Sequence, residues 1–295
     1  MMRRKRLTEL LPWLLPLRRW QRKTFFYIKQ YFDKASYSFH LYESTLPYTV
    51  FETSMTLINP DTGQDIIYQE NKVHNLKLAA RTLNHLVIYP GEAFSFWRLV
   101  RHADKHIPYK DGLVVENGQL KTEAGGGLCM MSNLLYWMFL HSELTVIERK
   151  GHAKKEFPDP GTQVIGVDAT VSEGWIDLQV KNETTQAYQI ILDFDNQSLH
   201  GRVLANSLPD YQIAIVNGPI RYIKSEPDVI EEAPVIRHYT DKNTNQIVKE
   251  KLLYTNRCII GYPLPQELFE HDDSDTLSSE VEEDESVLLY RSIIP

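Results

Sequence analysis

The chain has 295 residues, of which 42% are hydrophobic and 24% are charged, so it can bury a sizeable core as one large domain or two smaller ones. It contains two cysteines and no run of about 18 apolar residues, which argues against a disulfide framework and against a transmembrane helix. The net charge of −7 hides an asymmetry, because residues 3–34 carry ten Lys and Arg, whereas residues 267–285 carry ten acids and no Lys or Arg.

The N-terminal segment, residues 1–45, is basic, rich in aromatic residues and predicted to be helical. Residues 7–34 form one or two helices, with an interruption expected near Pro16. Basic residues are interleaved with aromatic residues in 1–34, which fits either a peripheral segment on an anionic membrane surface or a basic helix packed on the domain. We expect no nucleic-acid partner.

The apolar stretch from Leu10 to Leu17 is too short for a signal peptide and has no small-residue cleavage site after it. We therefore expect no cleavable signal peptide. This places the chain in the cytoplasm or peripherally at the membrane.

Hydrophobic periodicity and turn residues predict the central elements. The pattern at Val73, Leu76, Ala80 and Leu83 is typical of an amphipathic helix over 69–85. Asn117-Gly118 is a strong two-residue hairpin signal. The other predicted elements are a strand at 86–89 before Pro90-Gly91, hairpin strands at 113–115 and 119–121, and a buried helix at 128–140.

From residue 163 onward the pattern changes to short runs typical of strands. These predicted strands are 164–171, 175–181, 187–194, 199–204, 211–216, 220–223, 235–239 and 249–254. Helices followed by strands indicate an α+β fold, in which the N-terminal helices and the buried helix pack on a mainly antiparallel β-sheet. We expect one domain at 46–265, with a core at 70–182 and a β-rich extension at 183–265, and an acidic, disordered tail at 266–295.

The run Gly125-Gly126-Gly127-Leu128-Cys129 is the strongest chemical signal in the chain. Cys129 falls in the first turn of the predicted buried helix, where the helix dipole favours the nucleophilic thiolate. The three glycines allow backbone N–H groups to approach a substrate closely, as an oxyanion hole requires. The alternative is that Cys129 is an ordinary buried cysteine.

A nucleophilic cysteine needs a base and a group that orients the base. His152 follows the buried helix after a short connection and is the best candidate base, although it also fits a surface histidine. Asp168 is expected in mid-strand, where aspartate is disfavoured, so it is a candidate orienting or substrate-binding acid. Arg149 is a candidate ligand for a peptide carboxylate.

Several other residues have simpler expected roles. Ser132 and Asn133 are expected to satisfy the first turn of the helix. The aromatic residues Phe94, Phe96, Trp97 and Tyr109 are expected in the core rather than in a substrate platform. No zinc-ligand or phosphate-loop spacing is present, so we expect no metal and no cofactor.

Six sequence blocks in order resemble the VanW family over about residues 70–182. These blocks are Pro90–Phe96, Tyr109–Gly112, Glu116–Gly118, Gly125–Cys129, Glu148–His152 and Gly166–Val171. The resemblance implies a bacterial-envelope protein linked to glycopeptide resistance and peptidoglycan metabolism. Some members act as cysteine L,D-transpeptidases through the cysteine that matches Cys129.

The resemblance leaves two functions open. One is acyl transfer on peptidoglycan stem peptides, with Cys129, His152 and Asp168 as catalytic residues. The other is a non-catalytic accessory protein at the cytoplasmic membrane that binds peptidoglycan peptide or precursor. The chain departs from the family pattern at Met130, where the family usually has Gln, and in residues 153–157 after His152.

Overall fold

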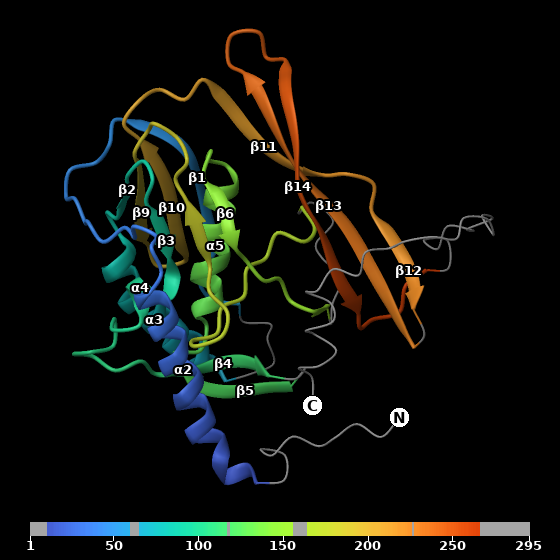
Figure 1. Ribbon diagram of the computed structural model, residues 1–295. Helices are drawn as coiled ribbons and strands as arrows, with labels where there is room; N and C mark the ends of the chain where they lie inside the picture. The colour runs from blue at the N-terminus through green and yellow to red at the C-terminus, as the bar shows by residue number, and fades with distance from the viewer. Residues whose placement is uncertain (1–10, 60–64, 117–118, 156–163, 226, 266–295) are drawn as a thin grey trace. The chain divides into compact units, whose positions relative to one another are not determined.

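The computed structural model describes residues 11–59, 65–116, 119–155, 164–225 and 227–265 (Figure 1). The chain divides into two compact units, one comprising Lys34–Phe269 and the other including the residues from the N-terminus to Asp33. The predicted disordered tail, residues 266–295, lies outside the described residues.

The N-terminal unit contains one helix of 17 residues, α2 (Leu15–Tyr31), preceded by a 3-10 turn, η1 (Pro12–Leu14). Pro16 lies in the first turn of α2, where a backbone N–H has no acceptor inside the helix and its loss costs nothing. The predicted interruption near Pro16 is therefore the start of the α-helix.

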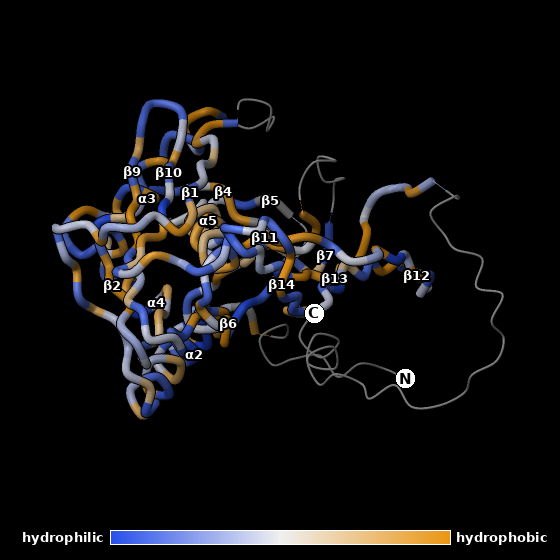
Figure 2. Tube along the Cα trace, turned by 90° about the horizontal axis from the view of Figure 1, so that it is seen from above, coloured by the Kyte–Doolittle hydropathy of each residue, from blue (hydrophilic) through white to orange (hydrophobic). Residues whose placement is uncertain are grey.

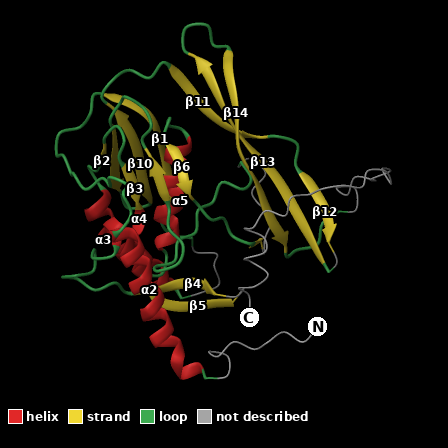
Figure 3. Ribbon diagram, in the orientation of Figure 1, coloured by secondary structure: helices red, strands yellow, loops and turns green. Residues whose placement is uncertain are grey.

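The helices described in the larger unit are among those drawn in red in Figure 3, and they lie in the first half of the chain: α3 (Ile66–Leu83), α4 (Phe96–Val100) and α5 (Leu128–Leu140). Asp65 caps α3 by accepting a hydrogen bond from the N–H of Ile67, which moves the helix start ahead of the predicted residue 69. The predicted buried face of α3 is confirmed at Leu76, Ala80 and Leu83. The predicted buried helix after the glycines is α5.

The described strands form four sheets. Their pairings are antiparallel except for β14–β7, which confirms the α+β class. The four-stranded sheet has the order β1-β10-β9-β2, with β1 (Tyr48–Thr56), β10 (Ser198–Ala205), β9 (Tyr188–Phe194) and β2 (Val87–Ile88). The three-stranded sheet is β3-β8-β6, with β3 (Ala93–Ser95), β8 (Gln179–Lys181) and β6 (Thr145–Glu148). The predicted hairpin is confirmed as β4 (Asp111–Glu116) and β5 (Gln119–Ala124); its Asn117-Gly118 turn lies outside the described residues.

The C-terminal part of the unit belongs to a sheet built on two strands of 14 residues each, β13 and β14. Its order is β11-β13-β14-β7, and β12 also pairs with β13; the bounds are β11 (Tyr211–Asn217), β12 (Arg221–Ser225), β13 (Asp228–Asp241), β14 (Ile247–Ile260) and β7 (Lys154–Lys155). The short parallel pairing of β7 with Ile259 and Ile260 joins this sheet to the segment that carries His152.

The predicted strand at 164–171 is wrong, and the predicted strand at 175–181 shortens to β8. Gly166 adopts a φ of +77°, which turns the chain. The next N–H groups are paired outside a ladder: Ala169 donates to the side chain of Asn133, and Thr170 donates to the carbonyl of Lys150. Residues 164–171 are therefore an irregular segment held by individual contacts.

The core gathers around α3, α5 and the strands beside them, where Figure 2 shows hydrophobic segments of the chain. Tyr136, Phe139, Phe94 and Phe96 are completely buried. Trp97 is also buried, so the predicted core role of these aromatic residues is confirmed, whereas Tyr109 is half-buried. No described helix is long and apolar enough to cross a membrane.

Candidate active site

The thiol of Cys129 lies in the first turn of α5, as the sequence predicts. Gly127 is the N-cap residue with a φ of +93°, and Cys129 is the second residue of the helix. Its Sγ atom lies 3.5 Å from Thr170 Oγ1 and 3.7 Å from the carbonyl oxygen of Val171. The side chain is half-buried, and it is a free thiol. The thiol therefore has access to solvent and lies at the positive end of the helix dipole, beside the hydroxyl group of Thr170.

The glycine loop is pressed against β4 of the hairpin. A Cβ atom on Gly126 would lie 2.2 Å from the carbonyl carbon of Gly112, and one on Gly112 would lie 2.5 Å from the carbonyl oxygen of Gly126. Asn75, which is fully buried on α3, donates from Nδ2 to the carbonyls of Gly126 (3.0 Å) and Lys110 (2.9 Å). The loop needs glycine because two backbones approach each other closely.

We expect Gly126→Ala to reduce the free energy of unfolding by about 3 kcal/mol, because the added methyl overlaps backbone atoms. The matched control is Gly91→Ala, which meets no atom within 4 Å and should cost only the strain of its left-handed φ of +82°, about 1 kcal/mol. Urea unfolding of both variants measures the difference. Equal losses would mean that the loop moves away from β4 freely.

Three consecutive N–H groups at the start of α5 have no acceptor among the described residues. The N–H of Gly125 donates to Lys110, and that of Gly126 donates to Glu123. Within the described part of the chain, no atom accepts from the N–H groups of residues 127, 128 and 129. The expected oxyanion donors at Gly125 and Gly126 are therefore already engaged, and the available donors are those of Gly127 and the first two helical residues.

Residues 168–171 connect the thiol to the candidate base. Asn133 Oδ1 accepts from the N–H of Ala169 at 2.7 Å, and Ser132 Oγ lies 2.6 Å from the carbonyl oxygen of Ala169. Ser132 also lies within donating distance (3.0 Å) of the carbonyl of Cys129, as expected for the first turn. The prediction for Asn133 is wrong, because its side chain holds this segment on α5. Asp168 thus lies two residues before Thr170, the residue that contacts the thiol.

His152 and Asp168, both predicted site residues, form a hydrogen-bonded pair. Asp168 Oδ2 accepts from the N–H of His152 at 2.6 Å and also contacts His152 Nδ1. The hydrogen bond to Asp168 raises the pKa of His152 against the effect of burial. Burial alone would raise the pKa of Asp168, but the His152 hydrogen bond and the Arg149 charge outweigh it, so that pKa is lowered. The imidazole is half-exposed, so it is open to a substrate.

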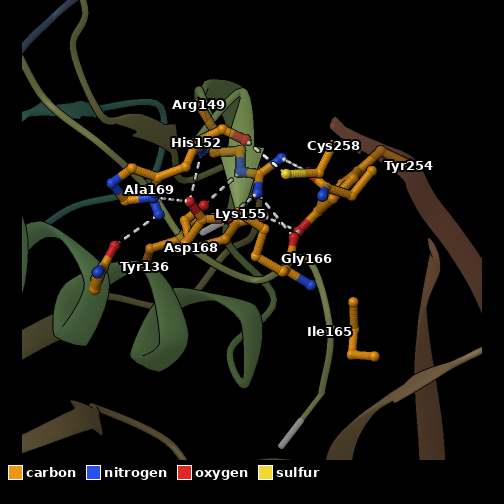
Figure 4. A network of polar contacts seen from close by, with 12 residues as sticks. Tyr136, Arg149, His152, Lys155, Ile165, Gly166, Asp168, Ala169, Tyr254 and Cys258 are labelled. Atoms are coloured by element: carbon orange, nitrogen blue, oxygen red, sulfur yellow. Dashed lines mark hydrogen bonds and ion pairs between the residues drawn. The ribbon is translucent and has the colours of Figure 1, made fainter. Parts of the chain in front are cut away.

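The guanidinium group of Arg149 forms hydrogen bonds with other groups of the protein (Figure 4). Its Nε donates to the carbonyl of Asp168 (2.7 Å), and Nη2 donates to Asp168 Oδ1 (3.0 Å) and the carbonyl of Gly166 (2.8 Å). Its Nη1 donates to Asn256, and the guanidinium carbon lies 4.7 Å from the centre of the Tyr254 ring. Four of its five N–H groups are thus used, and Arg149 holds Asp168 through both its carboxylate and its carbonyl oxygen. Binding of a peptide carboxylate by Arg149 stays a prediction.

Sequence reasoning missed the part of the site that comes from β14. Tyr254 donates its hydroxyl proton to the carbonyl of Gly166 (3.0 Å) and accepts from Tyr136 at 2.6 Å. Burial raises the pKa of both tyrosines. Cys258 is buried, with its Sγ 3.4 Å from the carbonyl oxygen of His152. No local motif marks these residues, because their partners lie about a hundred residues earlier in the chain.

We expect Asp168→Asn to lower the pKa of His152 from its raised value, because the carboxylate that stabilises the imidazolium is removed. An NMR titration of the imidazole measures this change, and Asp193→Asn, at an exposed position of β9, is the control. Because the pKa of His152 is raised in the folded state, His152 contributes stability that is fully present below pH 6.5. This stability is lost as the pH rises through the pKa of the folded state. Because the pKa of Asp168 is lowered in the folded state, Asp168 contributes stability that is fully present above pH 3.8. This stability is lost as the pH falls through the pKa of the folded state. The pair therefore contributes its full stability between pH 3.8 and pH 6.5. An unchanged His152 titration in Asp168→Asn would contradict the pairing of His152 with Asp168.

No group of three or more His, Cys, Asp and Glu in the described ranges has an arrangement that could hold a metal ion.

Residues 71–204 match the family described as VanW like protein. The chain is 55% identical over 266 residues to the vancomycin B-type resistance protein VanW of Enterococcus faecalis, covering 90% of this chain and 97% of that protein. The chain belongs to the VanW family. It is also 27% identical over 173 residues to the uncharacterized protein YoaR of Bacillus subtilis, covering 57% of this chain and 53% of YoaR. No solved structure matches.

The VanW match begins inside α3 and ends inside β10, so it contains the glycine loop, Cys129, His152 and Asp168. The contacts of Arg149 and His152 with Asn256, Tyr254 and Cys258 come from β14, beyond the matched range. In this VanW-family chain the C-terminal sheet therefore supports the candidate site from outside the family's matched region.

Proposed function

We propose that this VanW-family protein serves glycopeptide resistance as a cysteine acyltransferase of the L,D-transpeptidase type, acting on peptidoglycan stem peptides through Cys129. Its similarity to a relative named as a vancomycin resistance protein supports the biological setting. The observation that carries the chemistry is the half-buried thiol at the start of α5, where three N–H groups donate to no residue in the described part of the chain. Thiol and donors together match the needs of acyl transfer.

The proposed reaction has two steps. The Cys129 thiolate attacks a peptide carbonyl carbon, and the resulting oxyanion accepts hydrogen bonds from the N–H groups at the start of α5. The C–N bond breaks, a thioester remains on Cys129, and the leaving amine takes a proton from the His152 imidazolium. An amine of a second stem peptide then attacks the thioester, gives its proton to His152, and releases the thiolate with a new amide bond.

The surrounding residues support this chemistry through His152. A raised pKa increases the population of the imidazolium that protonates the leaving amine. Asp168 holds Nδ1, which leaves Nε2 for proton transfer. Arg149 fixes Asp168 through both its side chain and its carbonyl oxygen. The role of Asp168 in this proposal is to orient the base.

The second candidate is a non-catalytic accessory protein that binds peptidoglycan peptide or precursor at the membrane. The observation that favours it concerns the neighbours of the thiol. Cys129 Sγ contacts the hydroxyl of Thr170 and the carbonyl of Val171, neither of which is a base. Peptide binding by the free N–H groups alone requires no transfer of a proton to or from the thiol.

Mass spectrometry of the purified protein after incubation with stem peptides distinguishes the two functions. Acyl transfer predicts a thioester on the peptide fragment that contains Cys129, and release of it when an acceptor amine is added. Peptide binding without any adduct, shown by calorimetry at the same peptide concentration, would support the accessory function. If the protein neither forms an adduct nor binds the peptide, both proposed functions are contradicted.

A further inference from the structure

The helix α2 exposes an unusually apolar face. Large apolar side chains recur at intervals of three, four or eight residues, which places them on one side of the helix, with exposed fractions from 45% to 80%. They are Trp13 just before the helix, Leu17, Trp20, Ile28 and Tyr31. Phe25 (60% exposed) and Phe32 (76% exposed) extend this face at one edge. A row of such residues on the surface marks an interaction site.

Basic residues occupy the remaining circumference of α2. They are all exposed: Arg18, Arg19, Arg22, Lys23 and Lys29. No acidic residue occurs between residues 11 and 32, so no carboxylate within the helix offsets its positive charge. The chain as a whole has a net charge of −7, which makes this helix a local reversal of the overall sign.

We propose that α2 is a membrane-docking helix, which lies in the surface of an anionic bilayer with its apolar face among the acyl chains and its basic residues among the lipid phosphates. Trp and Tyr suit the boundary between headgroups and hydrocarbon because one end of each side chain is polar. Basic residues at the flanks attract anionic lipid, and the aromatic and aliphatic residues supply the buried apolar area.

Charge complementarity favours a lipid surface over a second copy of this chain. Two α2 helices that met through their apolar faces would bring two sets of five basic residues close together, at a cost in repulsion. An anionic bilayer instead stabilises both the apolar and the basic residues. Docking through α2 would hold the Cys129 unit at the membrane whether or not that unit is an enzyme.

Flotation of the full chain with vesicles tests the proposal. Vesicles that contain phosphatidylglycerol should bind the protein strongly at low salt, and binding should fall as salt screens the lipid charge. Pure phosphatidylcholine vesicles should bind it much less. Equal binding to both, or no binding to either, would overturn the proposal.

Paired variants assign the binding to α2. Lys23→Gln with Lys29→Gln should weaken partitioning about 25-fold, at about fivefold for each charge removed, whereas Lys242→Gln with Lys251→Gln, exposed in or near β14, should not. Leu17→Gln with Trp20→Gln should weaken it by at least about tenfold. The control is Leu208→Gln with Trp175→Gln, exposed residues in the larger unit.

Sedimentation velocity without lipid separates self-association from membrane docking. The wild-type chain and the Leu17→Gln with Trp20→Gln variant should have the same oligomeric state if α2 serves lipid. A dimer that this variant dissociates, combined with vesicle binding that it leaves unchanged, would overturn the proposal in favour of a second copy of the chain. Loss of binding in the control variants would also overturn it.

Discussion

Cys129→Ala should abolish formation of the acyl-enzyme and the protein's support of resistance, while the fold stays intact. Alanine keeps the start of α5 and removes only the Sγ atom, whose contacts at 3.5 and 3.7 Å are weak. The proposed reaction proceeds through a thioester at this atom, which alanine cannot form. Mass spectrometry with stem peptides, cell-based resistance and circular dichroism measure the three consequences.

Cys258→Ala is the matched control, because the chain has two cysteines and both are free. Cys258 is buried on β14 beside the carbonyl of His152, so its loss should cost stability of about 1 kcal/mol but leave the chemistry in place. If Cys129→Ala keeps full activity, the nucleophile assignment is wrong. If both alanine variants lose activity together with the fold, Cys129→Ser separates chemistry from packing, because serine restores the volume and not the thiol.

Arg149→Met should lower the free energy of unfolding by about 3 kcal/mol or more, since removal of one partner of a largely buried ion pair leaves the other uncompensated. The Arg149 side chain is 11% exposed and the Asp168 side chain 29%. The change also leaves the carbonyl of Gly166 and the side chain of Asn256 without this donor. Urea unfolding measures the loss.

Arg202→Met provides the matched comparison for Arg149. Arg202 pairs with Asp193 at 3.2 Å, but the two side chains are 40% and 61% exposed. Such a pair contributes at most about 1 kcal/mol. If the two variants lose the same stability, Arg149 does not organise the site. If Arg149→Met also returns the His152 titration toward its ordinary pKa, the positioning of Asp168 by Arg149 is supported directly.

Local signals in the sequence were sufficient for several parts of this protein. Asn117-Gly118 predicted the β4–β5 hairpin because two-residue turns with this pair match the twist of antiparallel strands. The continuous apolar run predicted a buried α5, and the glycines before it predicted a special backbone path, found as positive φ at Gly125 and Gly127. These features depend on residues within a few positions of one another.

The sequence did not reveal contacts whose partners lie far along the chain. Alternating apolar residues at 164–171 indicated a strand, but the backbone of Ala169 and Thr170 pairs with Asn133 and Lys150 instead of with a neighbouring strand. The same alternation is compatible with either outcome, because period alone does not say whether a partner strand is available. The short strands β3 and β7 carried too few residues for a periodic signal.

The sequence by itself determined the family, the α+β class, the thiol at the start of α5 and the candidate pair His152 and Asp168. The tertiary structure alone decided that Arg149 faces Asp168 and that β14 supplies Tyr254 and Cys258 beside them. The physical reason is that a charge or hydroxyl group has no preferred partner along the chain. Its role is set by whichever groups folding brings within hydrogen-bonding distance in a partly buried environment, where each must be paired.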